Sequence, residues 1–238
     1  MAKTSGFVGF APGATEFFRD LAENNDRTWF LAHKSEYEAR IVVPLEALLA
    51  GLIAALDERG LPLTGDPKKS IFRIHRDVRF SADKRPYKTS AGAALTRGGG
   101  KGKSGVLYVH LAADECFAAA GYYNPDRDAL GALREAIYTE PDRFAALCEA
   151  LAGSGLALDA ADRLTRMPRG FEAAADTLTA PALRLKSFVV RRAISHSQLS
   201  SPKLLADIVA FAEDAAPLLE FGHAALSVLD PTALTRRM

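Results

Sequence analysis

The sequence predicts an α+β fold in which a mainly antiparallel sheet packs against helices from both the N-terminal and the C-terminal parts of the chain. Helical spacing of apolar residues dominates up to Gly60, and it returns after Asp126. Between these stretches, apolar and polar residues alternate with a period of two, which is typical of half-buried strands. The strands follow one another closely, and short connections join antiparallel strands, whereas parallel strands need a long crossover.

Three helices are predicted before the strands. The first covers residues 14–23 and is interrupted by the polar run 24–26, which can cap a second helix that begins near Arg27. A third helix is expected from Pro44, because proline suits a first helical turn, and it carries a broad apolar stripe. Gly60 is a suitable residue to end it.

Residues 72–80 are predicted to form the first strand, because apolar and polar side chains alternate along them. One face would carry the apolar Phe72, Ile74 and Val78, and the other face would carry the polar Arg73, His75, Asp77 and Arg79. Further strands are predicted at residues 90–97, 106–112, 116–123 and 184–190, and further helices at residues 127–138, 141–151 and 201–219.

The composition is that of an ordinary globular protein, with 238 residues of which 48% are hydrophobic and 25% charged. No Pro-, Gly- or Ser-rich linker divides the chain, so we predict a single domain over residues 1–238. The formal net charge is only +1, which gives no general reason for attraction to nucleic acid or membranes. We recognise neither a secretory signal nor a continuous apolar run near the roughly 20 residues that span a bilayer. With only two cysteines, these features predict a cytoplasmic protein without a membrane partner, and they leave the oligomeric state open.

Charge is distributed unevenly along the chain. Residues 68–103 contain eleven Lys or Arg and two Asp, which is a net charge of +9. Residues 104–181 contain six Arg and twelve Asp or Glu, which is a net charge of −6. The basic middle of the chain is therefore the first place to look for a binding surface.

Six motifs occur in order along the chain: Asn24-Asn25-Asp26-Arg27-Thr28-Trp29-Phe30, Ile71-Phe72-Arg73-Ile74-His75-Arg76-Asp77-Val78-Arg79-Phe80-Ser81, Asp83-Lys84-Arg85-Pro86-Tyr87-Lys88-Thr89, Gly121-Tyr122-Tyr123-Asn124-Pro125, Met167-Pro168-Arg169-Gly170-Phe171 and Leu185-Lys186-Ser187-Phe188. Together they resemble the family called domain of unknown function 2461. The resemblance spans roughly residues 6–221 and leaves 222–238 as a tail. It implies an α+β domain of bacteria and fungi with no established activity. His75 departs from the family, which usually has Tyr there, and this argues against His75 as a catalytic acid or base.

The basic segment 73–88 is the predicted working surface. Arg side chains and Lys charges bind carboxylate or phosphate groups, and an aromatic ring adds stacking. Residues from later strands would complete a polar concavity if they share the same sheet face. The predicted ligand-binding residues are Arg73, His75, Arg76, Arg79, Lys84, Tyr87, Lys88, Tyr108, His110 and Lys186. The simpler alternative is a solvated face whose arginines pair with acids from the later part of the chain.

Three classes of function remain open for this surface. We favour binding of a small phosphate- or carboxylate-bearing ligand, as in an enzyme or sensor, with Tyr87, Tyr108 or His110 as candidates for proton transfer. A nucleic-acid binder would use the same basic run, although near-neutral total charge and few stacking aromatics disfavour it. An interaction module would dock an acidic protein partner on the same surface.

A second candidate patch lies at the start of the second helix. We interpret Trp29 and Phe30 as anchors in the core, since large aromatic residues at helical spacing usually pack inward. Asn25 and Asp26 are sufficiently explained as helix caps.

Other sites are not supported by the sequence. The run Gly102-Lys103-Ser104 matches the end of a phosphate-binding loop, but Arg97 stands where the first glycine belongs and a strand is predicted afterwards in place of a helix. The five histidines show no paired helical spacing, and there is no Cys-x-x-Cys, so no metal site is predicted. No motif of a catalytic nucleophile occurs, and we predict no cofactor.

Overall fold

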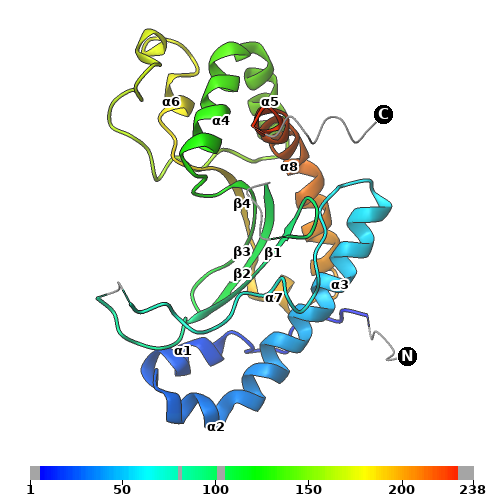
Figure 1. Ribbon diagram of the computed structural model, residues 1–238. Helices are drawn as coiled ribbons and strands as arrows, with labels where there is room; N and C mark the ends of the chain where they lie inside the picture. Colours follow the sequence, from blue (N-terminus) through cyan, green and yellow to red (C-terminus); the bar gives the residue numbers. More distant parts are fainter. Residues whose placement is uncertain (1–5, 80–81, 101–104, 230–238) are drawn as a thin grey trace. The chain divides into compact units, whose positions relative to one another are not determined.

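The computed structural model describes residues 6–79, 82–100 and 105–229, and its elements are labelled in Figure 1. The chain divides into two compact units, each built from several stretches of sequence. Unit 1 contains Met1–Gly100, Leu107–Ala118 and Arg192–Phe211. Unit 2 contains Lys101–Val106, Ala119–Arg191 and Ala212–Met238. Since both units contain strand residues, the boundary does not follow the order of the elements, and the predicted single domain stays a prediction.

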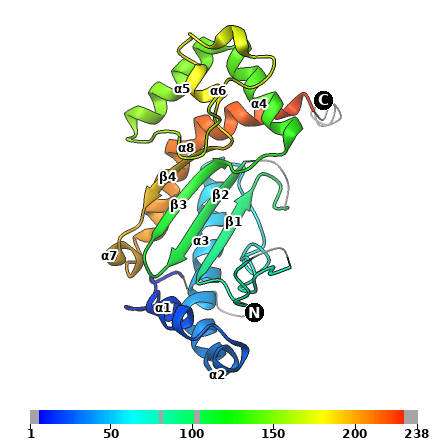
Figure 2. The ribbon, with the colours of Figure 1, turned by 90° about the vertical axis from the view of Figure 1, so that its left-hand side faces the viewer.

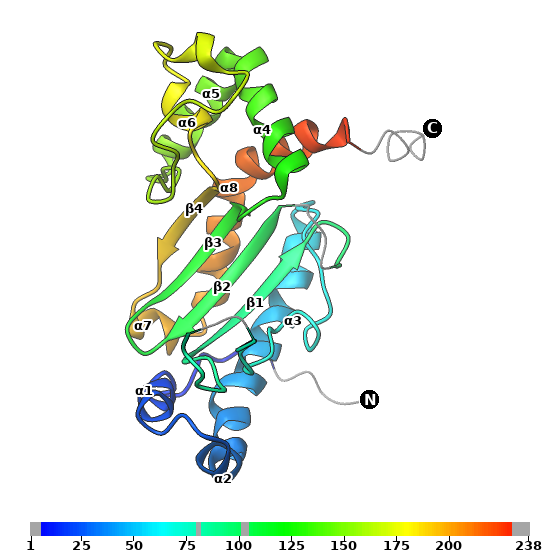
Figure 3. The ribbon, with the colours of Figure 1, turned by 60° about the vertical axis from the view of Figure 1, so that its left-hand side comes forward.

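Four strands form one antiparallel sheet in the order β1-β2-β3-β4 (Figure 3). They are β1 (Ser90–Thr96), β2 (Val106–Ala112), β3 (Cys116–Tyr122) and β4 (Phe188–Ala193). With helices before and after these strands, the predicted α+β class is confirmed. The first three strands lie where alternation predicts them, whereas β4 begins at Phe188 and not at residue 184.

Alternation along β2 separates a core face from a polar face. Leu107, Val109 and Leu111 are each at most 1% exposed, while Tyr108 and His110 between them are half-buried. Helix α3 (Val43–Glu58) lies behind β1 and β2, as Figure 2 shows. The apolar side chains of β2 and α3 thus form the core of unit 1.

The N-terminal helices are α1 (Glu16–Glu23), α2 (Arg27–Tyr37) and α3. Asp26 caps α2 as predicted, because its carboxylate accepts hydrogen bonds from the N–H groups of Thr28 and Trp29. Where the sequence predicts two separate helices, the structure has one helical path that passes through a π turn at Glu38–Val42. Pro44 follows this turn directly and has no N–H to donate, so a wider turn just before it is physically reasonable.

Helix α3 supplies much of the apolar core of unit 1. Five of its leucines are at most 1% exposed: Leu45, Leu48, Leu49, Leu52 and Leu56. Gly51 lies against the Leu205 side chain at the start of α8 (Leu204–Ser227), where a larger residue would collide. By length and composition alone, the helical stretch Arg27–Glu58 is able to cross a membrane. A core helix that buries a row of leucines has the same composition, so this feature does not identify a membrane span.

Unit 2 contains the later helices. They are α4 (Arg127–Thr139), α5 (Pro141–Gly153), the short α6 (Ala180–Leu183) and the part of α8 from Ala212 onward, together with a 3-10 turn at Glu172–Ala174. The Tyr122 hydroxyl donates a 2.7 Å hydrogen bond to the Leu219 carbonyl and so links β3 to α8 within this unit. Helix α8 continues past the predicted end of the family-like core at residue 221. The short α7 (His196–Leu199) belongs to unit 1 and begins with a capping box at Ser195.

Candidate functional site

The predicted strand over residues 72–80 is wrong across residues 72–79, and Phe80 lies outside the described residues. In its described part, only Ile71 and His75 make isolated antiparallel bridges, to Ala93 and Tyr87 respectively. The chain instead pairs first with β1, through a 2.8 Å hydrogen bond from the Phe72 N–H to the Gly92 carbonyl. Beyond Phe72 the bridge partner changes to Tyr87, so the segment forms isolated bridges and no continuous strand. The burial still alternates, because Arg73, His75, Asp77 and Arg79 are exposed whereas Ile74 is buried and Val78 is half-buried.

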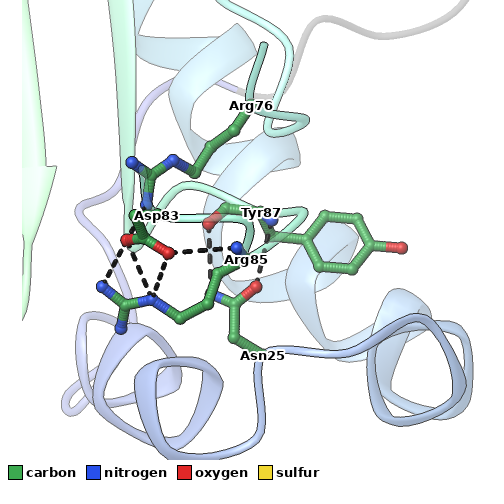
Figure 4. A network of polar contacts seen from close by, with 5 residues as sticks. All are labelled: Asn25, Arg76, Asp83, Arg85 and Tyr87. Carbon is green, nitrogen blue, oxygen red and sulfur yellow. Dashed lines mark hydrogen bonds and ion pairs between the residues drawn. The ribbon is translucent and has the colours of Figure 1, made fainter. Parts of the chain in front are cut away.

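Asn25 holds residues 86–88 in place, the part of the basic segment that runs back alongside residues 74–76. Its side-chain amide donates to the Tyr87 carbonyl at 3.1 Å and accepts from the Tyr87 N–H at 3.0 Å, as Figure 4 shows. On the opposite side, the Arg76 N–H donates to the Pro86 carbonyl and the Lys88 N–H donates to the Ile74 carbonyl, both at 2.8 Å. The Asn25 side chain thus imitates a neighbouring strand. This is a structural role beyond the helix cap that the sequence predicts for Asn25.

Tyr87 is a core residue of the segment. Its side chain is 3% exposed, and its ring stacks on Phe30 with a centroid distance of 4.2 Å. His75 lies beside it, with 5.2 Å between the two ring centroids. Because the Tyr87 ring is buried and stacks on Phe30, it is not exposed for the ligand stacking that the sequence predicts for it. The predicted core role of Phe30 agrees with its 4% exposure.

Asp83 forms ion pairs with Arg76, which is a predicted ligand residue, and with Arg85, which is not. The Arg76 guanidinium reaches its carboxylate at 2.5 Å and the Arg85 guanidinium at 2.7 Å, and the Arg85 N–H also donates to it at 3.0 Å (Figure 4). These donors, Arg85 first, hold the pKa of Asp83 well below its usual range. Both guanidinium groups are therefore engaged by one carboxylate, and the trio keeps a net positive charge.

Two more predicted cations are also engaged locally. Arg79 forms an ion pair with Asp77 at 2.6 Å, and its side-chain hydrogen bond is the main reason that the pKa of Asp77 is lowered. Lys84 donates a 2.9 Å hydrogen bond to the Val78 carbonyl. The alternative in which arginines pair with acids is thus partly correct, but the acids belong to the same segment and not to the later part of the chain.

Arg73 and Lys88 differ from these cations. In the described ranges of the chain, neither of them forms an ion pair with a carboxylate. The Lys88 ammonium lies 5.9 Å from the centroid of the Phe72 ring, which is within range of a cation–π interaction. Partial burial lowers the pKa of Lys88, and the nearby positive charge of Arg73 lowers it further. The fold therefore keeps two like charges close together.

An aromatic row crosses the sheet next to these two cations. The Phe72 ring lies 6.1 Å from the Tyr108 ring on β2, and the Tyr108 ring lies 6.1 Å from the Phe117 ring on β3. His110 stacks on Phe117 at 4.8 Å, and its Nδ1 is 3.0 Å from the Tyr108 hydroxyl. This row lies on the sheet face opposite α3, because these side chains alternate with the buried residues of β2 and β3. We call this group the sheet-face site, and it consists of Phe72, Arg73, Lys88, Tyr108, His110 and Phe117.

The family model described as Conserved hypothetical protein (DUF2461) matches residues 13–221, which include every residue of the sheet-face site. The chain belongs to the DUF2461 family. This confirms the resemblance carried by the six sequence motifs, and the description of the family assigns it no function. No match to the chain is found among the curated proteins or among the solved structures.

Four of the predicted site residues in this DUF2461 chain lie in the sheet-face site: Arg73, Lys88, Tyr108 and His110. Lys186 belongs to unit 2, where its ammonium lies 2.7 Å from the Asp162 carboxylate. Sequence reasoning missed Phe72, which was assigned to the core but is 43% exposed. It also missed Phe117, although the tight turn between β2 and β3 places Phe117 opposite His110.

The structure also bears on the other chemistry considered from the sequence of this DUF2461 protein. Among the described residues, no group of three or more His, Cys, Asp or Glu is placed to hold a metal ion. Burial is the main cause that raises the pKa of both Cys116 and Cys148, so neither thiol is activated as a nucleophile. Residues 102–104 of the glycine-rich run lie outside the described residues, and the strand β2 follows them, as expected for a hairpin.

Proposed function

We propose that this protein binds a small anionic ligand, bearing phosphate or carboxylate, at the sheet-face site through Arg73 and Lys88. The observation that carries this proposal is that Arg73 lies near enough to Lys88 to lower its pKa and that neither cation is ion-paired among the described residues, whereas the other three arginines of the basic segment each pair with Asp77 or Asp83. The acid in electrostatic reach of Arg73 is Asp77, whose carboxylate is held by Arg79. A bound anion would remove the repulsion between the two cations.

The effect of Lys88 on stability supports the same conclusion. A lysine whose pKa is lowered in the folded state disfavours folding while it is charged, since the unfolded chain binds the proton more tightly. Groups that cost stability are found at functional sites more often than elsewhere. An anion that contacts Lys88 favours its charged form, so binding should be accompanied by proton uptake at alkaline pH.

The test is to measure dissociation constants by calorimetry for inorganic phosphate, sugar phosphates and small carboxylates. We expect Arg73→Gln and Lys88→Met each to weaken binding of the preferred anion by about tenfold, as loss of a charged hydrogen bond does. The matched control is Lys69→Met, which removes one exposed positive charge from the basic middle of the chain, residues 68–103, outside the site. Equal losses in all three variants would indicate diffuse attraction and overturn the proposal. Absence of binding by any of these anions to the folded protein would also overturn it.

A nucleic-acid binder remains the second candidate because of one observation, the aromatic row on a sheet face. Single-stranded nucleic acids bind proteins by stacking bases on such rings beside basic residues. The small-ligand proposal is preferred because three of the four arginines of the basic segment direct their donors to Asp77 or Asp83, which leaves fewer free donors for a row of phosphates.

A further inference from the structure

We infer that the anion bound at the sheet-face site is carried on a flat aromatic ring, as in a mononucleotide, and that this ring stacks on the aromatic row. This inference rests on the proposed function and names its ligand class more closely. It follows from the geometry of the rings, from the exposure of Phe72 and from the position of Lys88 relative to Phe72.

The aromatic rings form a continuous surface and not a set of separate side chains. Successive centroids along the row Phe72, Tyr108 and Phe117 are 6.1 Å apart at both steps. These distances are within the range of direct ring contacts. The hydrogen bond between Tyr108 and His110 and the stacking of His110 on Phe117 connect the members further. A row held by its own contacts is ordered before a ligand arrives, which reduces the entropy lost on binding.

The sequence of β1 allows the Tyr108 ring to lie across the neighbouring strand. A Cβ atom added at Gly92 would come within 2.8 Å of ring carbons of Tyr108. Gly92 has no positive φ, so a turn does not explain the glycine, and the close approach of the ring does. A tyrosine that leans over the adjacent strand extends the aromatic surface toward Phe72.

Phe72 lies at the edge of this surface and is 43% exposed, which is unusual for a phenylalanine that has aromatic neighbours. A purely structural row would be expected to bury its terminal ring. The ring instead remains partly open to solvent, and the Lys88 ammonium lies over it, 5.9 Å from its centroid. A ligand ring stacked on Phe72 would therefore have a cation within reach of a phosphate attached to it.

The two cations and the aromatic row together favour a ligand that has both an aromatic ring and a phosphate over a simple anion. An inorganic phosphate or an aliphatic sugar phosphate would use Arg73 and Lys88 but would not stack on the exposed Phe72 ring. A neutral ring would use the row but leave the two cations facing each other. A mononucleotide satisfies both, since a nucleobase has a flat π face and its phosphate accepts hydrogen bonds from Arg and Lys.

The experiment compares five probes on the wild-type protein: inorganic phosphate, ribose 5-phosphate, adenosine, adenosine 5′-monophosphate and a short single-stranded oligonucleotide. Stacking of one base contributes about 1–3 kcal/mol, so we expect the mononucleotide to bind about 5- to 150-fold more tightly than ribose 5-phosphate. In the variant Phe72→Leu this advantage should fall about tenfold or more, while the affinity for ribose 5-phosphate stays within twofold. Tyr123→Leu is the matched control, because Tyr123 is also an exposed aromatic residue, at 79% exposure, and lies outside the site.

A second readout does not depend on affinity. The protons of the bound base should shift upfield in the NMR spectrum of the ligand, because they lie over an aromatic ring, and the shift should be lost in Phe72→Leu. This measurement separates stacking from a change in folding, which is followed for each variant by circular dichroism.

Each outcome has a distinct meaning. If phosphate, ribose 5-phosphate and the mononucleotide bind equally, and binding requires Lys88 but not Phe72, the ring inference is overturned and the anion site stands. If none of the probes binds, both are overturned. Equal binding of adenosine and the mononucleotide would overturn the role of the cations. An oligonucleotide that binds more than about 100-fold more tightly than the mononucleotide, with affinity falling steeply with salt, would replace the small ligand by nucleic acid.

Discussion

Replacement of Asn25 tests whether the basic segment is held by one side chain. In Asn25→Ala, the Tyr87 main chain loses a donor at 3.1 Å and an acceptor at 3.0 Å, both in a part-buried environment. A hydrogen bond contributes about 0.5–1.5 kcal/mol net, so the loss of two should reduce the free energy of unfolding by about 2 kcal/mol. For a chain of this size, that corresponds to a decrease in Tm of about 4–8 °C.

The assay is thermal and urea unfolding followed by circular dichroism, with Asn24→Ala as the matched control. Asn24 is the neighbouring residue of the same type, but its side chain donates one exposed 3.0 Å hydrogen bond to the Asp20 carbonyl. We expect the control to change the free energy of unfolding by no more than about 0.5 kcal/mol. A loss as small as this in Asn25→Ala would refute the argument that Asn25 substitutes for a neighbouring strand.

The variant Asn25→Asp separates the two hydrogen bonds. An ionised carboxylate still accepts from the Tyr87 N–H, but it faces the Tyr87 carbonyl without a proton to donate. The pKa of the new carboxyl is therefore expected above its unfolded value, and the variant should recover stability relative to wild type as the pH falls. An unchanged difference between pH 7 and pH 4 would contradict this account.

Three further predictions concern glycines and charges. Gly121→Ala should reduce the free energy of unfolding by at least about 2 kcal/mol, since φ is +131° and an added Cβ would lie within 3.0 Å of the main chain of the facing strand. Gly131→Ala lies within α4 with open space around it, so it should instead raise the free energy of unfolding by about 0.5–1 kcal/mol in the same assay. Lys88→Met should leave the ligand-free Tm unchanged or raised at pH 7, because the charge of a lysine with a lowered pKa opposes folding, and this difference should disappear as the pH rises through the unfolded pKa of lysine. Asp83→Asn should be less stable than wild type above about pH 5 and equal to it in strong acid, because a carboxyl with a lowered pKa stabilises the fold until the pH falls through that pKa; urea unfolding across pH measures both titrations.

The sequence predicted most elements whose side chains alternate between core and solvent. Strands β1, β2 and β3 were found within one residue at each end. Alternate side chains are buried along β2, whereas β1 and β3 are buried along most of their length. Helix α4 likewise starts at the predicted residue, where Asp126 caps it. The start of the last strand was predicted four residues too early, at residue 184. Residues 184–187 continue the alternation of the strand, but Leu185 pairs with the loop at Arg163 and not with the sheet.

The failed strand over residues 72–80 has a different cause. Its alternation is real, but a strand needs neighbours along its whole length, and this segment has them only at its start and at His75. Residues 86–88 are instead held by the side chain of Asn25, which is 62 residues from Tyr87 in the sequence. A periodicity argument reads only local spacing, so it cannot find a side chain that takes the place of a strand.

The sequence partly predicts which cations of the basic segment are ion-paired. Asp77 and Asp83 each stand two residues before an arginine, and each accepts hydrogen bonds from both the N–H and the guanidinium of that arginine. This spacing is the one at which an aspartate side chain bonds the main chain of a turn, so an arginine at that position is already within reach. Arg73 and Lys88 have Ile71 and Pro86 at the corresponding positions and therefore lack such a partner. The net charge of +9 already subtracts Asp77 and Asp83. The spacing identifies Arg79 and Arg85 as partners of these aspartates, but not Arg76, which has Ile74 two residues before it and still pairs with Asp83.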